Sequence, residues 1–165
     1  MHLTRVAAGA FVTAMLTSVA GVGGAHAAPP AANEAHVVGV VTYDPADPHV
    51  GYVQARYRCD YADPHLWVSV KQNDARTADP ALAEEGSGGL GAATTWLDSH
   101  RNPVTCDGMW HTQVFTVDQV EPSWNGGGVK PGALDKGEAW VQFCLTSGDE
   151  GDGYSDMQFR KVRAA

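Results

Sequence analysis

The side chains with the clearest potential for catalysis in this sequence are one cysteine and several histidines. A thiolate beside an imidazole can attack a carbonyl carbon, so Cys144 with a histidine would make a hydrolytic site. The histidines beyond the first 27 residues are His36, His49, His65, His100 and His111. Cys144 has no local catalytic signature around it. We therefore predict that the protein is not an enzyme, and a hydrolase built on Cys144 is the third hypothesis for its function.

The same histidines lack the spacing of a metal site. Pairs such as His-x-His or His-x-x-x-His do not occur among them, and we interpret them as surface or turn residues. Residues 149–156 (DEGDGYSD) gather carboxylates in a flexible loop, as Ca²⁺ binding requires, but their spacing differs from that of an Asp-x-Asp-x-Asp-Gly loop. An acidic turn between strands explains them as well. We predict no metal ion and no cofactor, with calcium in this loop as the alternative.

The five tryptophans are a surplus for a chain of this size. Trp67 and Trp140 fall on the side of their expected strands opposite the aliphatic residues, and Trp124 lies in a glycine-rich loop. Exposed indoles offer flat apolar surface with a polar group, which suits a sugar or another protein. The alternative is that these rings belong to the core or lie under the loop. The sequence leaves both open.

Residues 1–27 have the pattern of a cleavable signal peptide. Arg5 supplies the positive charge, residues 6–22 are uncharged and mainly apolar, and Ala25-His26-Ala27 is a small-residue cleavage motif. The apolar run is short for a membrane span, which needs about 20 residues. We expect the protein to be secreted, either extracellular or associated with the cell wall.

The remaining chain has room for one domain. Residues 28–35 form a Pro/Ala-rich leader that we expect to be disordered, and residues 36–165 form the domain. The net charge of the full sequence is −8. Such a charge repels phosphate backbones and anionic lipids. We therefore expect neither nucleic acid nor a membrane as a partner, but an extracellular protein or a carbohydrate.

Alternation of apolar and polar residues with a period of two predicts an all-β fold. The expected strands are 36–43, 51–59, 66–72, 92–97, 109–117, 138–146 and 154–162. A hairpin is expected to join 51–59 to 66–72, with one helical turn at 79–85 and a flexible loop at 86–91. About seven short strands separated by Gly, Pro and Asp turns predict an antiparallel β-sandwich.

Three cysteines in an exported chain imply one disulfide and one free thiol, and three pairings are possible. Cys59 is in phase with the inward residues of its strand, whereas Cys144 falls on the outer side with Trp140. Cys106 lies in a turn and can orient either way. The phases favour a Cys59–Cys106 disulfide, leaving Cys144 as a free thiol that could link two chains into a dimer.

Four short motifs carry a resemblance to a known group of proteins. They are Tyr57-Arg58-Cys59, Val68-Ser69-Val70-Lys71-Gln72, Cys106-Asp107-Gly108 and Gly137-Glu138-Ala139-Trp140-Val141. In this order they resemble small secreted actinobacterial immunoglobulin-like β-sandwich domains of unknown function. The resemblance implies a disulfide from the Cys59 strand to the Cys-Asp-Gly turn and no catalytic residues. Cys144 departs from the pattern.

These observations support three functional hypotheses from different classes. The first is a secreted non-catalytic immunoglobulin-like module that binds an unidentified partner outside the cell. The second is a carbohydrate-binding module that uses Trp67, Trp124 or Trp140 to stack on sugars. The third is the secreted hydrolase described above. Fold class cannot choose among them, because function resides in the site that a fold carries.

Overall fold

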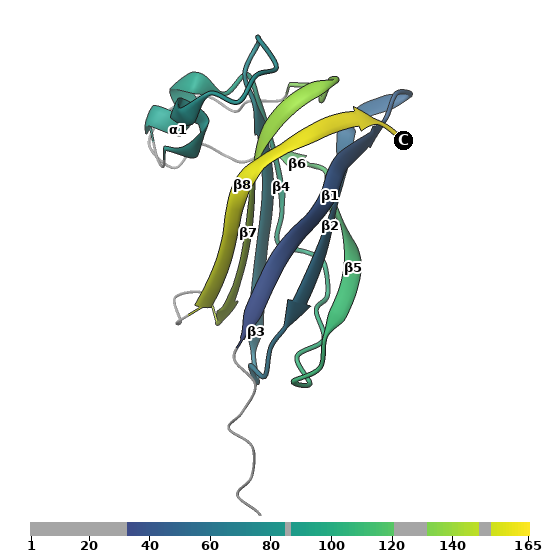
Figure 1. Cartoon of the computed structure of the whole chain (residues 1–165), viewed down its shortest axis with the longest axis vertical. Coiled ribbons are helices and arrows are strands. Elements are labelled where there is room, and N and C mark those ends of the chain that lie inside the picture. Colours follow the sequence, from purple (N-terminus) through teal and green to yellow (C-terminus); the bar gives the residue numbers. More distant parts are fainter. Residues whose placement is uncertain (1–32, 85–86, 121–131, 149–152) are drawn as a thin grey trace, which may run out of the picture.

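The structure is a computed structural model that describes residues 33–84, 87–120, 132–148 and 153–165 (Figure 1). The predicted signal peptide, residues 28–32 of the predicted leader, Trp124 and residues 149–152 of the acidic loop lie outside the described residues. Within the part of the chain that is described, no helix is both long and apolar enough to cross a membrane.

The described chain is mostly β-strand. The elements in chain order are β1 (Glu34–Asp44), β2 (Asp47–Arg58), β3 (Pro64–Gln72), the 3-10 helix η1 (Pro80–Ala83), α1 (Ser87–Ala92), β4 (Thr95–Ser99), β5 (His111–Val117), β6 (Gln119–Val120), β7 (Gly137–Ser147) and β8 (Gly153–Ala164). Every expected strand is present with its ends shifted by a few residues, and β6 is additional. β1 begins inside the stretch that we expected to be a disordered leader.

Hydrogen bonds join the described strands into one sheet with the order β5-β2-β1-β8-β7-β3-β4-β6. Neighbours are antiparallel with one exception. β1 and β8 are parallel, with Val41 opposite Val162 and Tyr43 opposite Ala164. The expectation of a purely antiparallel arrangement is therefore wrong. The sheet is mixed because β8, which returns antiparallel to β7, runs in the same direction as β1 where the two strands meet.

The predicted hairpin between the second and third strands does not form. β2 pairs with β1 and β5, whereas β3 pairs with β4 and β7, so both edges of each strand are occupied by other partners. One half of the sheet is β5-β2-β1 and the other half is β8-β7-β3-β4-β6, so the connection between β2 and β3 crosses from the first half to the second. Within this connection, the Asp63 carbonyl accepts a hydrogen bond from the Gly148 N–H (2.7 Å). Local alternation defined the strands correctly but did not identify their partners.

β1 lies between the two halves of the sheet and pairs with both (Figure 1). Its register with β2 is interrupted between Val38 and Thr42, and the pairing with β8 begins within this interruption, at Val41. Gly39 lies in the interruption with a φ of +72°. Only glycine adopts this conformation without steric cost, so Gly39 allows the bulge that turns β1 toward β8.

One core lies between the two halves of the sheet. Both halves contribute to it, and its members on β2, β3 and β7 are the residues that the alternation placed inward: Val53, Ala55, Tyr57, Leu66, Val68, Val70, Ala139, Val141, Phe143 and Leu145. Phe115 of β5 and Phe143 of β7 meet edge to face, with ring centroids 5.0 Å apart. This contact ties the far strand of one half to the centre of the other.

The glycine-rich segment in the middle of the chain is a helix and not the expected loop. The expected turn at 79–85 is present as η1, capped by the Asp79 side chain, but α1 occupies most of the predicted loop 86–91. A Cβ on Gly89 would lie 2.0 Å from the carbonyl oxygen of Glu84. The glycine therefore permits close backbone approach, and buried Leu82 and Leu90 anchor the two short helices. Packing overrides the weak helix propensity of this segment.

A single side chain covers part of the free edge of β5. The Asn102 amide donates to the Thr116 carbonyl (3.0 Å) and accepts from the Thr116 N–H (3.2 Å). Asn102 is in turn held by the Ser99 hydroxyl, which accepts from its amide nitrogen at 2.9 Å. At Thr116 the amide thus occupies the two backbone groups that a further strand would use.

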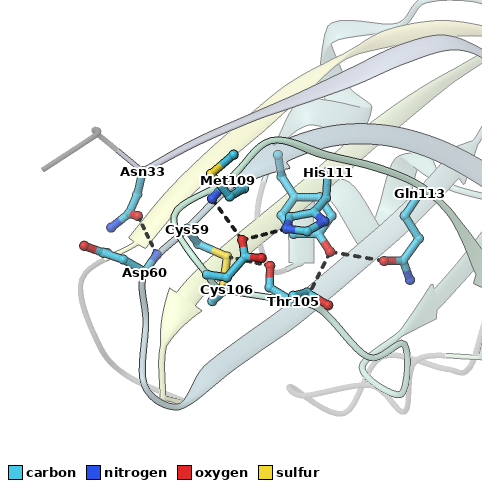
Figure 2. Close-up of a disulfide and its surroundings, with 10 residues drawn as sticks. Asn33, Cys59, Asp60, Thr105, Cys106, Met109, His111 and Gln113 are labelled. Carbon is cyan, nitrogen blue, oxygen red and sulfur yellow. Dashed lines mark hydrogen bonds and ion pairs between the residues drawn. A yellow bond between two sulfur atoms is a disulfide. The ribbon is translucent and has the colours of Figure 1, made fainter.

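The structure contains the Cys59–Cys106 disulfide that the strand phases favoured, and Cys144 is a half-buried free thiol. The bond closes a loop between residues 47 positions apart. Figure 2 shows its surroundings, where the Thr105 N–H donates to the Tyr57 hydroxyl (3.2 Å) and that hydroxyl donates to Gln113 (3.1 Å). The disulfide therefore fixes the 100–110 segment against the end of β2.

Replacement of Gly39 by alanine is expected to lower the free energy of unfolding by about 1–2 kcal/mol, since an L-residue is strained at positive φ. No atom lies within 4 Å of the added Cβ, so the loss would come from the backbone alone. Gly91→Ala is the matched control, because its Cβ also meets nothing and its φ is ordinary. Urea denaturation measures both, and equal effects of the two substitutions would refute the assignment of strain to Gly39.

Removal of the disulfide in the Cys59→Ser/Cys106→Ser double variant is expected to cost about 2–5 kcal/mol of unfolding free energy. Cys144→Ser should cost much less, because this thiol lies outside the core cluster. Non-reducing peptide mapping should recover the peptides of Cys59 and Cys106 as one cross-linked fragment, with only Cys144 alkylated after unfolding. A fragment linking Cys59 to Cys144 would contradict both the pairing and the phase of β7.

Candidate functional site

The outer face of β3, β4 and β7 combines tryptophans with polar side chains. We call it the tryptophan face, and its members are Trp67, Ser69, Lys71, Trp96, Asp98, Trp140, Gln142 and Cys144. Each alternates with a core residue along its strand. The sequence placed the members on β3 and β7 on this side, and the structure confirms it. Trp96 lies in the expected strand 92–97 but was not assigned to a face, and Asp98 was missed because that strand ended at residue 97.

Trp67 and Trp140 are half-buried, so neither is the fully exposed platform that sugar stacking would favour. The Trp67 ring stacks on the ring of His100 with an interplanar angle of 4° and centroids 6.0 Å apart. The Trp140 ring meets the Phe159 ring edge to face at 4.9 Å. Each indole is therefore held in place by a second ring. Trp124, the third predicted aromatic, lies outside the described residues.

Two charged residues of the tryptophan face are buried. Lys71 is 1% exposed, and its Nζ lies 4.0 Å from the centroid of the Trp96 ring, in a cation–π contact. Asp98 is equally buried. Buried charges are costly unless they are compensated, and both residues take part in a further interaction in the structure.

The indole nitrogens of Trp67, Trp96 and Trp140 are buried, and no hydrogen-bond partner is present for them among the described residues. An unpaired buried donor costs about 1–3 kcal/mol. Three such donors on one face are unusual for a folded protein.

The contact between Cys144 and Ser155 does not activate the thiol as a nucleophile. The Ser155 hydroxyl donates to its sulfur at 3.3 Å. A serine hydroxyl is not a base at neutral pH and does not generate a thiolate. The hydrolase hypothesis required an imidazole in this role.

Two histidines that are far apart in the sequence lie together beside Trp67. The Nε2 atom of His65 is 3.2 Å from the Nδ1 atom of His100, and the Nε2 atom of His100 is 3.8 Å from a carboxylate oxygen of Asp98. Sequence spacing missed this pair because β3 and β4 bring together residues 35 positions apart. Within the described residues, no group of three or more His, Cys, Asp and Glu side chains is arranged to hold a metal ion.

The outer face of the other half of the sheet carries arginines. We call it the arginine face, formed by β1, β2, β5 and the end of β8, with His36, Thr42, Tyr52, Gln54, Arg56, Arg58, Trp110, Val114 and Arg163. The Trp110 ring contacts two guanidinium groups, with the Cζ atoms of Arg56 and Arg58 at 4.2 Å and 4.9 Å from its centroid. The His36 ring stacks on it at 6.1 Å.

A shallow concavity of about 350 Å³ opens in the arginine face. It is lined by Gly39, Val40, Thr42, Tyr52, Gln54, Val114 and Arg163. Val114 is 55% exposed, which is high for an aliphatic residue in the middle of a strand. The Gly39 bulge forms one wall, so the same backbone feature that redirects β1 also shapes this surface.

The arginines of this face differ in whether a carboxylate neutralises their charge. Arg58 is ion-paired with Glu34 at 3.0 Å. Arg56 and Arg163 have no carboxylate partner among the described residues, although the chain as a whole is acidic. The alternation at 54–58 placed Arg56 and Arg58 outward, but it gave no sign of the concavity, which depends on β1 and β8.

Two lowered pKa values belong to exposed ion pairs. A hydrogen bond with His111 (2.8 Å) lowers the pKa of Asp107 from its ordinary value, with the Met109 N–H as a smaller cause. A hydrogen bond from Lys161 (2.8 Å) lowers the pKa of Glu138, helped by the Ala78 N–H. Both carboxyl groups are more stable as anions in the fold, so they act as structural contacts and not as proton donors.

The described geometry thus presents two candidate surfaces on opposite sides of the core. One is the tryptophan face with its buried charges, and the other is the arginine face with its concavity. Comparison with known proteins finds no match for the chain to a known protein family, to a curated protein or to a solved structure.

Proposed function

We propose that the protein is a secreted, non-catalytic immunoglobulin-like module that binds a protein partner outside the cell through the arginine face. The export pattern of residues 1–27 and the internal disulfide support a location in an oxidising compartment. Two sheet halves around one core are compatible with an immunoglobulin-like β-sandwich of the kind that the four sequence motifs resemble.

The observation that carries this proposal is a concavity lined by one arginine, with a second arginine further along the same face, both without a carboxylate partner among the described residues. Arg163 lines it, and Arg56 follows Gln54 on the same side of β2. A guanidinium binds a carboxylate with two parallel hydrogen bonds, which gives a strong and directional contact. Exposed Val114 adds apolar area beside these charges. Together they suit an acidic segment of a partner protein.

The overall charge of the chain constrains how such a partner would bind. A net charge of −8 repels an acidic partner at long range, but screening limits this repulsion to about 8 Å at physiological salt. Attraction from Arg56 and Arg163 acts once the surfaces are in contact. We therefore expect local contacts, and not electrostatic steering, to dominate the affinity.

Capture of partners from the native culture medium on the immobilised mature protein tests the proposal. The Arg56→Ala/Arg163→Ala double variant should capture at least tenfold less of the partner protein than the wild type does. Arg101→Ala is the matched control, because Arg101 is ion-paired with Asp118 and does not line the concavity. Equal capture by the wild type and the double variant would refute the proposed surface.

A second candidate function, carbohydrate binding, rests on the three indole donors of the tryptophan face. Sugars have apolar ring faces and many oxygen atoms that accept hydrogen bonds. The indole N–H groups of Trp67, Trp96 and Trp140 have no such acceptor among the described residues. The rings are half-buried or buried, so a sugar would have to approach through a small adjustment of this face.

A glycan array distinguishes this candidate. If the tryptophan face binds a sugar, Trp67→Ala should abolish the signal and Trp140→Phe, which keeps a ring but removes the N–H, should weaken it. Trp110→Phe on the opposite face should leave it unchanged. Absence of any glycan signal from the wild type, or an unchanged signal in the Trp67 variant, would contradict carbohydrate binding at this face.

A further inference from the structure

We propose that His65 and His100 form a binding site for a divalent transition-metal ion such as Zn²⁺ or Cu²⁺. His65 lies near the start of β3, and His100 directly follows β4, so the pairing of these strands brings the two imidazoles together. The site goes beyond the proposed binding function, and neither residue belongs to the arginine face.

The separation of the two ring nitrogens is the first support for the site. The Nε2 atom of His65 and the Nδ1 atom of His100 are 3.2 Å apart. Imidazole nitrogens bind Zn²⁺ at about 2.0–2.1 Å, so two of them on one tetrahedral ion lie about 3.3–3.4 Å from each other. The two rings therefore already have the spacing of a chelating pair.

The carboxylate of Asp98 provides the second support, because its negative charge lies on the side of the His100 ring that faces away from His65. Its oxygen lies 3.8 Å from the Nε2 atom of His100, which is too long for a hydrogen bond but close enough for electrostatic attraction to an Nε2–H group. A proton on Nε2 is favoured beside this carboxylate, which leaves the lone pair of Nδ1 directed at His65. Histidine ligands of metals are commonly oriented in this way by a carboxylate on the other nitrogen.

The surroundings hold the ligands and leave them accessible. The Trp67 ring stacks on the His100 ring with an interplanar angle of 4°, and the neighbouring Asp98 carboxyl is 2% exposed. The His100 side chain itself is 39% exposed, so an ion can enter from solvent. Nitrogen ligands suit Zn²⁺, Cu²⁺ and Ni²⁺, whereas Ca²⁺ and Mg²⁺ prefer oxygen. Water would complete the coordination.

The same contact also fits a direct hydrogen bond, in which the Nε2–H of His65 donates to the Nδ1 atom of His100. The two interpretations differ in one measurable respect. A hydrogen bond alone gives no saturable metal affinity, whereas a chelating pair binds one ion per chain and loses it when either ring is removed.

Titration of the mature, untagged protein with Zn²⁺ and with Cu²⁺ tests the proposal by calorimetry, together with the electron paramagnetic resonance spectrum of the Cu²⁺ form. We expect one ion per chain and nitrogen hyperfine coupling from two imidazoles. His65→Ala and His100→Ala should each weaken binding at least a hundredfold, and Asp98→Asn should weaken it about 10–100-fold through the tautomer.

His111→Ala is the matched control, because His111 also faces a carboxylate but lies near the disulfide and should leave the affinity unchanged (Figure 2). Circular dichroism of each metal-free variant confirms that it is folded. If a variant fails to fold, His65→Gln and His100→Gln replace it. No saturable binding by the wild type, or equal binding by the wild type and both histidine variants, would overturn the proposal.

Discussion

β1 is hydrogen-bonded to β2 on one side and to β8 on the other, and the β1–β8 pair is the only hydrogen-bonded strand pair that joins the two halves of the described sheet. Each half has an apolar inner face that is unstable in water, so the halves must be held face to face. The bulge at Gly39 gives β1 the bend that this requires. The disulfide and the Phe115–Phe143 contact then secure the closed arrangement from within the core.

Closure around one core leaves two outer faces of different chemistry. The face of β3, β4 and β7 buries charge and indole donors, whereas that of β1, β2 and β5 displays arginines and an aliphatic side chain. Both are built on strands whose inward residues are fixed by packing, so the outward side chains have defined positions. A rigid sheet that presents residues in register is suited to recognition, and it needs no moving part.

Residues with a purely local signal were predictable from the sequence. Alternation placed Val53, Ala55, Tyr57 and Cys59 inward and Trp140 and Cys144 outward, because the side chains of a strand alternate whatever its partner is. Strand partners were not predictable: the expected hairpin failed because the register of β2 and β3 is decided by β1, β5, β4 and β7. The His65–His100 pair and the concavity depend on those long-range pairings, which explains why spacing along the chain did not reveal them.

The contact of the Asn102 amide with the backbone of Thr116 affects how one molecule can associate with another. β5 ends the sheet on one side, and an uncovered edge strand is a template on which further chains can add and grow into fibrils. An amide side chain imitates the peptide group of an added strand, but it has no continuing backbone behind it. It therefore ends the sheet at Thr116 as an end group ends a polymer chain, and it opposes the addition of a strand from a second molecule at this point.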